Sequence, residues 1–292
     1  AVGVVDENKE IIARATVKTR PDRMLDDVIY DIAGCVKEAV KKAGITLADC
    51  VSVGIGSPGI VDPESGRVVF ASNIAFSDYP LVAEMKKRLG KKCVLINDGN
   101  AAALAECRLG AAKDYKNVVM MTLGTGVGGG IIIDRKVYTG SLFGAGEVGH
   151  MVIEKGGRKC ACGRRGCFEQ YASATGLVKT SRMMAEKYPE SLLAKEEINA
   201  MTAFRLSRGG DAASREAVGE FIGDLAEGTA NIITLFSPDA VVIGGGVSNE
   251  GEPLFSPLRE KVRKILPGDK TPIVRALLGS DAGIIGAALA AM

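Results

Sequence analysis

One histidine and three cysteines form the sharpest chemical pattern in the chain. His150, the single histidine, precedes Cys160, Cys162 and Cys167. One imidazole and three thiolates complete a tetrahedral donor set, the composition of a structural zinc site. Three buried free cysteines and a surface histidine are the alternative, but close cysteine spacing beside glycine turns favours a metal. Basic neighbours are expected to favour the thiolates, and these are Arg158, Lys159, Arg164 and Arg165.

A glycine-rich segment spans residues 124–130, and five of its seven residues are glycine. A dinucleotide fingerprint would need a helix next, whereas residues 131–138 have the composition of a strand. We therefore predict a glycine-rich hairpin whose N–H groups, with the Thr125 hydroxyl, could bind phosphate oxygens. An ordinary tight hairpin is the alternative. A second glycine run, residues 244–246, is a similar close-approach site or a packing turn.

Asn97 and Asp98 end a short apolar segment and begin a predicted helix. Ligands of α/β lobes usually bind at the carboxyl ends of strands. A carboxylate there could accept the proton of a hydroxyl nucleophile, as an aspartate does in kinases. From this segment alone, Asp98 is equally well explained as a helix cap.

Two further carboxylates, Glu147 and Glu169, lie on either side of the histidine–cysteine cluster. A metal would fix both in place, and paired acceptors suit neighbouring sugar hydroxyls. Surface acids with no role are the alternative.

The elements that position these residues are predicted from apolar periodicity and glycine stops. In the first part of the chain, apolar strands alternate with helices, which is typical of an α/β lobe. The segments expected there are strands at 1–5, 51–56 and 93–97 and helices at 26–44, 81–89 and 101–109. The second part is expected to hold strands at 118–122, 131–134, 240–243 and 273–276 and helices at 214–236, 254–265 and 283–291.

Length and composition limit the class of protein. The 292 residues are 47% hydrophobic and 25% charged, which is typical of a soluble globular chain with two lobes. The net charge of +2 favours neither a nucleic-acid nor a membrane partner. No apolar run reaches the roughly 18–20 residues that span a bilayer, and no signal peptide opens the sequence. We expect a cytoplasmic protein with reduced cysteines. Cys35, Cys50, Cys93 and Cys107 are expected in the core.

Taken together, the motifs resemble the ROK family (repressors, open reading frames, kinases) along essentially the whole chain. Within that family they are similar to the bacterial glucokinases. The cysteine motif with its following glutamate is the most specific of them. The matching segments are residues 56–62, 97–102, 123–130, 147–150, 160–169, 244–248 and 281–286.

The resemblance implies an actin-like (ribonuclease H-like) α/β fold of two lobes around a cleft. Residues 1–110 with the helix at 281–292 would form the small, sugar-side lobe. Residues 111–280 would form the large lobe, with the zinc loop and the nucleotide site. It also implies ATP, Mg²⁺, a structural Zn²⁺ and a homodimer.

The resemblance further implies a role for each matched residue. Asp98 would be the general base on the sugar hydroxyl. Substrate hydroxyls would be held by Gly59, Asn97, Asp98, Glu147, His150 and Glu169. The nucleotide would be bound by Gly124, Thr125, Gly126, Gly245 and Gly246. The zinc ligands would be His150, Cys160, Cys162 and Cys167.

Two departures from the family pattern stand out. Family kinases open with a strand and a phosphate hairpin of the form Asp-x-Gly-Gly-Thr-Lys, and Ala1 falls where their second strand begins. We therefore expect the natural product to be longer, and we expect the small lobe of these 292 residues to have unpaired sheet edges. Gly99 stands where the family often has alanine, and we expect little effect because the position needs only a small residue.

The function expected from this resemblance is ATP-dependent phosphorylation of glucose to glucose 6-phosphate. One alternative is a kinase for another hexose or an N-acetylhexosamine, because pocket walls rather than the base select the sugar. Another is a ROK regulator that senses sugar without phosphorylating it. Regulators of that family carry a helix-turn-helix before the kinase-like part, and no such segment or basic patch is evident in the sequence.

Overall fold

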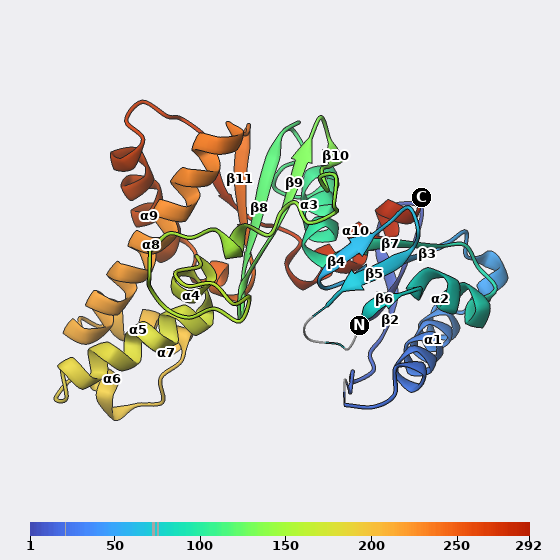
Figure 1. Ribbon diagram of the computed structural model, residues 1–292, viewed down its shortest axis with the longest axis horizontal. Helices are drawn as coiled ribbons and strands as arrows, with labels where there is room; N and C mark the ends of the chain where they lie inside the picture. The colour runs from blue at the N-terminus through green and yellow to red at the C-terminus, as the bar shows by residue number, and fades with distance from the viewer. Residues whose placement is uncertain (21, 72–73, 75) are drawn as a thin grey trace.

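The computed structural model describes residues 1–20, 22–71, 74 and 76–292. Two α/β lobes lie side by side and are joined through two helices, α3 (Asp98–Leu109) and α10 (Ala282–Ala291) (Figure 1). No helix among the described residues is both long enough and apolar enough to cross a membrane.

The large lobe is built on a five-stranded sheet. Its order is β10-β9-β8-β11-β12, with β8 parallel to β11 and antiparallel to β9. The strands are β8 (Val118–Leu123), β9 (Val127–Ile133), β10 (Lys136–Val137), β11 (Ala240–Gly244) and β12 (Ile273–Arg275). Alternate residues of β8 face opposite layers, because successive side chains of a strand point to opposite faces. Both faces are therefore apolar, as in a sheet covered on both sides.

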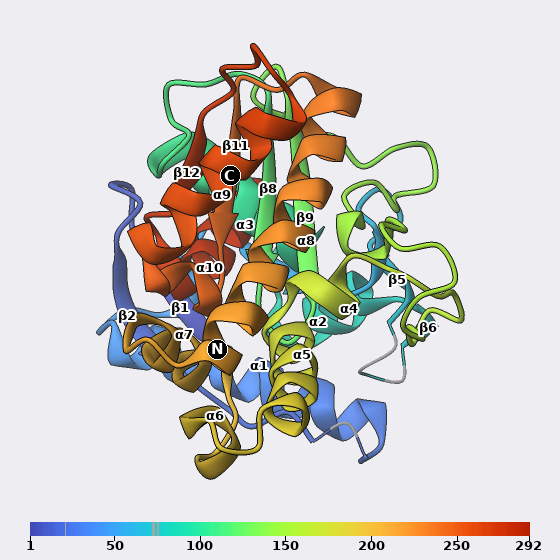
Figure 2. The same ribbon diagram turned by 90° about the vertical axis from the view of Figure 1, so that its left-hand side faces the viewer.

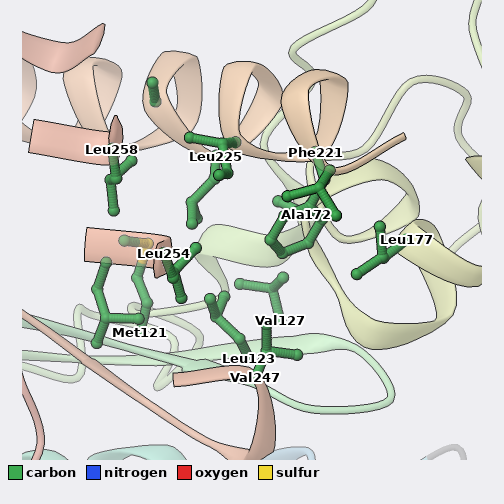
Figure 3. Close-up of a cluster of buried hydrophobic side chains, with 14 of the residues drawn as sticks. Met121, Leu123, Val127, Ala172, Leu177, Phe221, Leu225, Val247, Leu254 and Leu258 are labelled. Carbon is green, nitrogen blue, oxygen red and sulfur yellow. The ribbon is translucent and has the colours of Figure 1, made fainter. Parts of the chain in front are cut away.

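Helices cover both faces of this sheet. One face packs against α8 (Ala212–Phe236) and α9 (Glu252–Ile265), where Leu123, Leu225 and Leu254 meet in a single apolar cluster (Figures 2 and 3). The other face packs against α3 and α10. Further helices extend this lobe: α4 (Glu169–Ala172), α5 (Ala174–Lys187), α6 (Leu192–Lys195) and α7 (Ala200–Arg208).

The small lobe divides its strands among three small sheets. The pairs are β1 (Val2–Val5) with β2 (Ile11–Ala15), and β3 (Val53–Ser57) with β7 (Cys93–Asn97). A third sheet holds β4 (Ile60–Asp62), β5 (Arg67–Phe70) and β6 (Ser77–Tyr79). The helices are α1 (Leu25–Lys42) and α2 (Leu81–Leu89). Among the described strands, β1 and β3 belong to different sheets.

Helix α10 closes the gap between these pieces. Its backbone approaches α3 and β3 so closely that only glycine fits: a Cβ on Gly286 would lie 1.7 Å from the Ala101 carbonyl oxygen. A Cβ on Gly54 of β3 would lie 1.8 Å from the carbonyl oxygen of Ala287. The helix therefore contacts both α3 and the small-lobe strands, so it ties them together.

Short 3₁₀ turns complete the chain, and their bounds are η1 (Leu47–Asp49), η2 (Val148–His150), η3 (Gly246–Glu250) and η4 (Gly279–Asp281).

The predicted helices and strands are confirmed, with shifted ends. Two groups were missed, the antiparallel β4–β6 sheet and the helices α4–α7. Cys35, Cys93 and Cys107 are buried as expected, whereas Cys50 is only half-buried, which corrects that prediction.

Candidate functional site

A cleft of about 410 Å³ gathers residues from both lobes. Three acidic side chains, Asp98, Glu147 and Glu169, line it together with the glycines at the β8–β9 turn. The lining residues are Gly59, Asn97, Asp98, Gly99, Thr122, Gly124, Gly126, Val127, Gly128, Gly129, Glu147, Glu169 and Gly245. Eight of the predicted site residues thus meet in one cavity, although they come from distant parts of the chain.

Asn97, and not Asp98, is the N-cap residue of α3. Asn97 caps α3, because its Oδ1 accepts a hydrogen bond from Asn100 N at 3.0 Å. Within the described part of the chain, the Asp98 carboxylate accepts only from Gly99 N, at 2.8 Å, and it is exposed in the cleft. The cap interpretation of Asp98 is therefore wrong, and the carboxylate is available to a ligand.

Asn97 also fixes the opposite wall of the cleft. Its Nδ2 donates to the Gly59 carbonyl oxygen at 2.9 Å. Gly59 has φ 83°, and a Cβ there would lie 2.1 Å from the Phe70 carbonyl oxygen, so glycine is required at this turn. The side chain of Asn97 is thus used mainly to hold the backbone around Asp98 and Gly59. Its contact with a sugar stays a prediction.

Glu147 and Glu169 face the same space from the large lobe. Burial raises the pKa of Glu147 although part of the residue stays exposed. His150 opposes that shift, whereas Asp98 and Glu169 add to it. Three carboxylates so close together favour a ligand that donates hydrogen bonds over a free anion.

Glu169 is positioned by its neighbour in sequence. The ring of Phe168 is fully buried against α8, where Gly228 makes room for it: a Cβ on Gly228 would lie 2.3 Å from the ring. With Phe168 anchored, Cys167 turns toward the cysteine cluster and Glu169 toward the cleft. Glu169 Oε2 would lie 2.6 Å from a Cβ on Gly126, so the carboxylate lies directly beside the β8–β9 turn.

The four predicted metal ligands do come together. The ligand atoms of His150, Cys160, Cys162 and Cys167 all lie within 4.8 Å of one another. The Sγ atoms of Cys162 and Cys167 are 3.5 Å apart, and Cys160 Sγ is 3.7 Å from His150 Nδ1. The edges of a tetrahedral zinc–sulfur site measure about 3.8 Å. The donor set and its spacing therefore fit zinc.

The second role expected of His150 is less direct. Its Nδ1 is directed at Cys160 and lies 4.0 Å from Glu169 Oε1. His150 does not line the cleft, whereas Glu169 does. The histidine thus connects the cysteine cluster to a cleft carboxylate, and its contact with a sugar stays a prediction.

The basic residues around the cysteines act only partly as expected. Arg158 stacks on the Tyr171 ring and donates to the Gln170 carbonyl oxygen and Thr180, so it holds the loop to α5. The backbone N–H of Arg164 lowers the pKa of Cys162 to about 6, while burial raises the pKa of Cys160 to about 12. Arg164 acts as predicted on two of the thiols, because its side chain lowers the pKa of Cys162 and of Cys167, although burial still raises the pKa of Cys167 overall.

The glycine segment is shorter as a loop than predicted. Only Gly124–Gly126 form the turn, which we call the hairpin tip, because residues 128–130 belong to β9. A Cβ on Gly130 would lie 2.7 Å from Ala103 Cβ of α3, and one on Gly129 would lie 2.6 Å from the Gly146 carbonyl oxygen. These two glycines thus serve close packing, which corrects the argument that the glycine count itself indicates phosphate.

The other predicted nucleotide residues lie near the tip. Gly245 has φ 83°, and a Cβ there would lie 2.5 Å from the Leu123 carbonyl oxygen at the end of β8. Thr125 and Gly246 are exposed and do not line the cleft. Their contacts with a nucleotide therefore stay predictions.

The backbone at Gly99 leaves no room for even a methyl side chain, contrary to the expectation that any small residue would fit. A Cβ there would lie 2.4 Å from the Gly129 carbonyl oxygen, so alanine requires α3 or β9 to shift. The cleft also uses Thr122 and Val127, which sequence reasoning missed. Both lie on strands directly flanking the hairpin tip, and that position is the only signal that could have indicated them.

Comparisons with known proteins agree with this geometry. The ROK family model matches residues 1–292. The chain is 39% identical over 297 residues to a glucokinase of Thermotoga maritima, covering 99% of this chain and 92% of that protein. The crystal structure of a ROK family glucokinase from Streptomyces griseus in complex with glucose and AMPPNP is 36% identical, with a TM-score of 0.85 over 99% of this chain and 94% of that one.

A ROK hexokinase from Thermus thermophilus is 32% identical, with a TM-score of 0.83 over 99% of this chain and 93% of that one. Similarity of this extent establishes both the fold and the family of the chain. The chain has the two-lobe, actin-like fold, and it belongs to the ROK family.

Proposed function

We propose that this protein is an ATP-dependent kinase that converts glucose to glucose 6-phosphate. The observation that carries the proposal is the Asp98 carboxylate, which is free of capping and exposed in a cleft beside Glu147, Glu169 and the hairpin tip. Relatives named glucokinase at 35–39% identity over nearly the whole chain support it.

The chain's own residues divide the work between the two ends of the cleft. At the sugar end, Asp98 takes the proton of the attacking hydroxyl while the other polar groups hold the sugar. This set is Gly59, Asn97, Glu147, His150 and Glu169. At the phosphate end, main-chain groups and one hydroxyl hold the nucleotide. The residues there are Gly124, Thr125, Gly126, Gly245 and Gly246.

Phosphoryl transfer depends on positioning and charge neutralisation more than on covalent chemistry. Mg²⁺ prefers oxygen ligands and supplies that neutralisation when it enters with the phosphates of ATP. Asp98 contributes the acceptor for the proton of the attacking sugar hydroxyl. Its Oδ1 accepts from Gly99 N, which holds the carboxylate at the first turn of α3.

We assign the zinc site a structural role. His150, Cys160, Cys162 and Cys167 would hold the ion, and all four tetrahedral positions would be filled by protein. The bound ion would then fix the loop that ends at Glu169. The same family pattern favours a homodimer in the cytoplasm. It also favours a small lobe of residues 1–110 with 281–292 and a large lobe of residues 111–280.

A sugar-panel assay tests the function. ATP-dependent phosphorylation is measured for glucose, mannose, fructose, allose, N-acetylglucosamine and N-acetylmannosamine. We expect the highest kcat/KM for glucose. Asp98→Asn should lower kcat at least about a hundredfold with glucose binding retained. Asp114→Asn, at an exposed position outside the cleft, should leave activity unchanged.

The panel separates the alternatives. A clear preference for another sugar would assign the protein to that kinase activity instead. Sugar binding without turnover of any panel member would contradict the kinase proposal and favour a regulator. Unchanged kcat in Asp98→Asn would refute the role of that carboxylate.

A further inference from the structure

A buried carboxylate lies at the far end of the helix that carries Asp98. Glu106 belongs to the last turn of α3 and is fully buried. Acidic residues are almost never fully buried unless their oxygens are paired. The position is also unfavourable for a negative charge, because the C-terminal end of a helix carries the negative end of its dipole. The residue therefore needs an explanation that the proposed catalytic roles do not supply.

The partners of Glu106 are the two chain segments that join α3 and α10 to the large-lobe sheet. The first link, residues 110–117, runs from α3 to β8, and the second link, residues 276–281, runs from β12 to α10. Glu106 Oε2 accepts from Ala111 N at 2.8 Å, and Oε1 accepts from Leu278 N at 2.7 Å. One carboxylate thus holds both links.

Glu106 also uses its main-chain carbonyl oxygen on the first link, where it accepts from Gly110 N and Ala112 N. Three successive N–H groups of that link therefore end on one residue. Gly110 leaves room for the carboxylate, because a Cβ there would lie 2.0 Å from Glu106 Oε2. The site is built around this side chain.

The near end of α3 has no tolerance for a shift. The backbones of α3 and β9 lie so close together that a Cβ at Gly99 or at Gly130 would clash with the opposite segment. Glu106 is eight residues from Asp98, about 12 Å along the helix axis. A helix transmits displacement along its length, so loosening its last turn tilts the first one. Misplacing a catalytic group by about 1 Å can cost a hundredfold in rate.

We propose that Glu106 is a positioning residue: by binding both links it fixes α3 against the large lobe, so that Asp98 stays aligned with the hairpin tip. The inference rests on the proposed kinase function. It goes beyond that function in placing part of the catalytic alignment at a buried carboxylate outside the cleft.

Glu106→Gln keeps the shape of the side chain but replaces one acceptor oxygen with a donor, so one link loses its bond. We expect kcat to fall about ten- to a hundredfold, with KM for glucose and ATP within about twofold of the parent's. Glu260→Gln, an exposed glutamate of α9, is the control and should match the parent. A fall in thermal stability alone, with kcat unchanged, would make Glu106 merely structural and would overturn the proposal.

A second pair of variants removes only the donor of the second link. Leu278 has φ −83°, near the range of proline, so Leu278→Pro deletes the N–H at a compatible φ. Leu278→Ala loses the same side-chain packing but keeps the N–H. We expect kcat to be lower in the proline variant than in the alanine variant. Equal kcat in the two would overturn the proposal even if Glu106→Gln does not fold.

Amide hydrogen exchange of the links gives a readout that does not depend on activity. Amides of residues 110–112 and 278 should be protected in the parent and should exchange faster in Glu106→Gln. Unchanged protection would overturn the proposal. Absence of sugar phosphorylation by the parent would instead refute the proposed function, so the two failures are distinguishable.

Discussion

Two regions of the large lobe deliver groups to the same cleft by different physical means. The hairpin tip is the turn between β8 and β9, two long strands paired at every residue from Val118 to Leu123. The metal loop, residues 150–167, has only two isolated bridges of sheet pairing among its described residues. It is anchored by Arg158 and by the buried ring of Phe168, and the four candidate ligand side chains gather within it. Under the proposed function, the phosphate end of the cleft would be held by the sheet, and Glu169 at the sugar end by the candidate metal site.

This difference predicts that the two substrates can be perturbed separately. Damage to the metal loop should weaken the sugar and spare ATP, whereas damage to the tip should do the reverse. Three variants test that separation, beginning with the largest expected effect.

Cys167→Ser removes a fully buried cysteine of the candidate metal site. We expect loss of bound zinc, a fall of about a hundredfold or more in kcat/KM for glucose, and little change in nucleotide affinity. Metal analysis, glucose kinetics and calorimetry with a non-hydrolysable nucleotide provide the measurements. Cys50→Ser, at the half-buried cysteine of the small lobe, is the control for loss of a thiol. Equal losses for glucose and nucleotide would show that the two ends are not independent.

Gly228→Ala places a methyl group 2.3 Å from the ring of Phe168. Overpacking of this kind costs about 1–3 kcal/mol, and the displaced ring should carry Glu169 with it, raising KM for glucose. Gly219→Ala on the same helix meets no atom within 4 Å. It should stabilise the protein by about 0.5–1 kcal/mol because alanine favours helix over glycine. Chemical denaturation compares the two, and equal stability would contradict the tight fit at Gly228.

Thr125→Ala removes the one side-chain donor at the hairpin tip. A hydrogen bond of this kind is worth about 0.5–1.5 kcal/mol, so KM for ATP should rise by a few-fold to about tenfold with KM for glucose unchanged. Thr19→Ala, exposed in the small lobe, is the control. An unchanged KM for ATP would place the nucleotide elsewhere than at the tip.

The same contrast explains what the sequence could predict. Residues 118–121 and 240–243 are continuous apolar runs that belong to a sheet buried on both faces, so periodicity and composition sufficed for them. The four candidate metal ligands are close in sequence and chemically distinctive, so their clustering could be predicted too. Motif resemblance supplied most of the cleft residues, although composition alone left Asp98 undecided between cap and base.

Other features depend on contacts that no local pattern contains. The β4–β6 sheet pairs segments of only three or four residues whose order comes from neighbours such as α2, so it was missed. The need for glycine at Gly99 arises from the carbonyl of Gly129 across the α3–β9 contact. Thr122 has the sequence pattern of an ordinary strand residue, and it is placed in the cleft by the way β9 folds back beside it.

The position of α10 has a consequence for the order in which the molecule can assemble. This helix covers β3 and α3 through backbone contacts at Gly54, Ala101 and Gly286, yet it follows the entire large lobe in sequence. During synthesis from the N-terminal end, the small-lobe strands emerge long before their cover does. The small lobe must therefore complete its packing after the large lobe has been translated, because the surface that α10 covers stays uncovered until then.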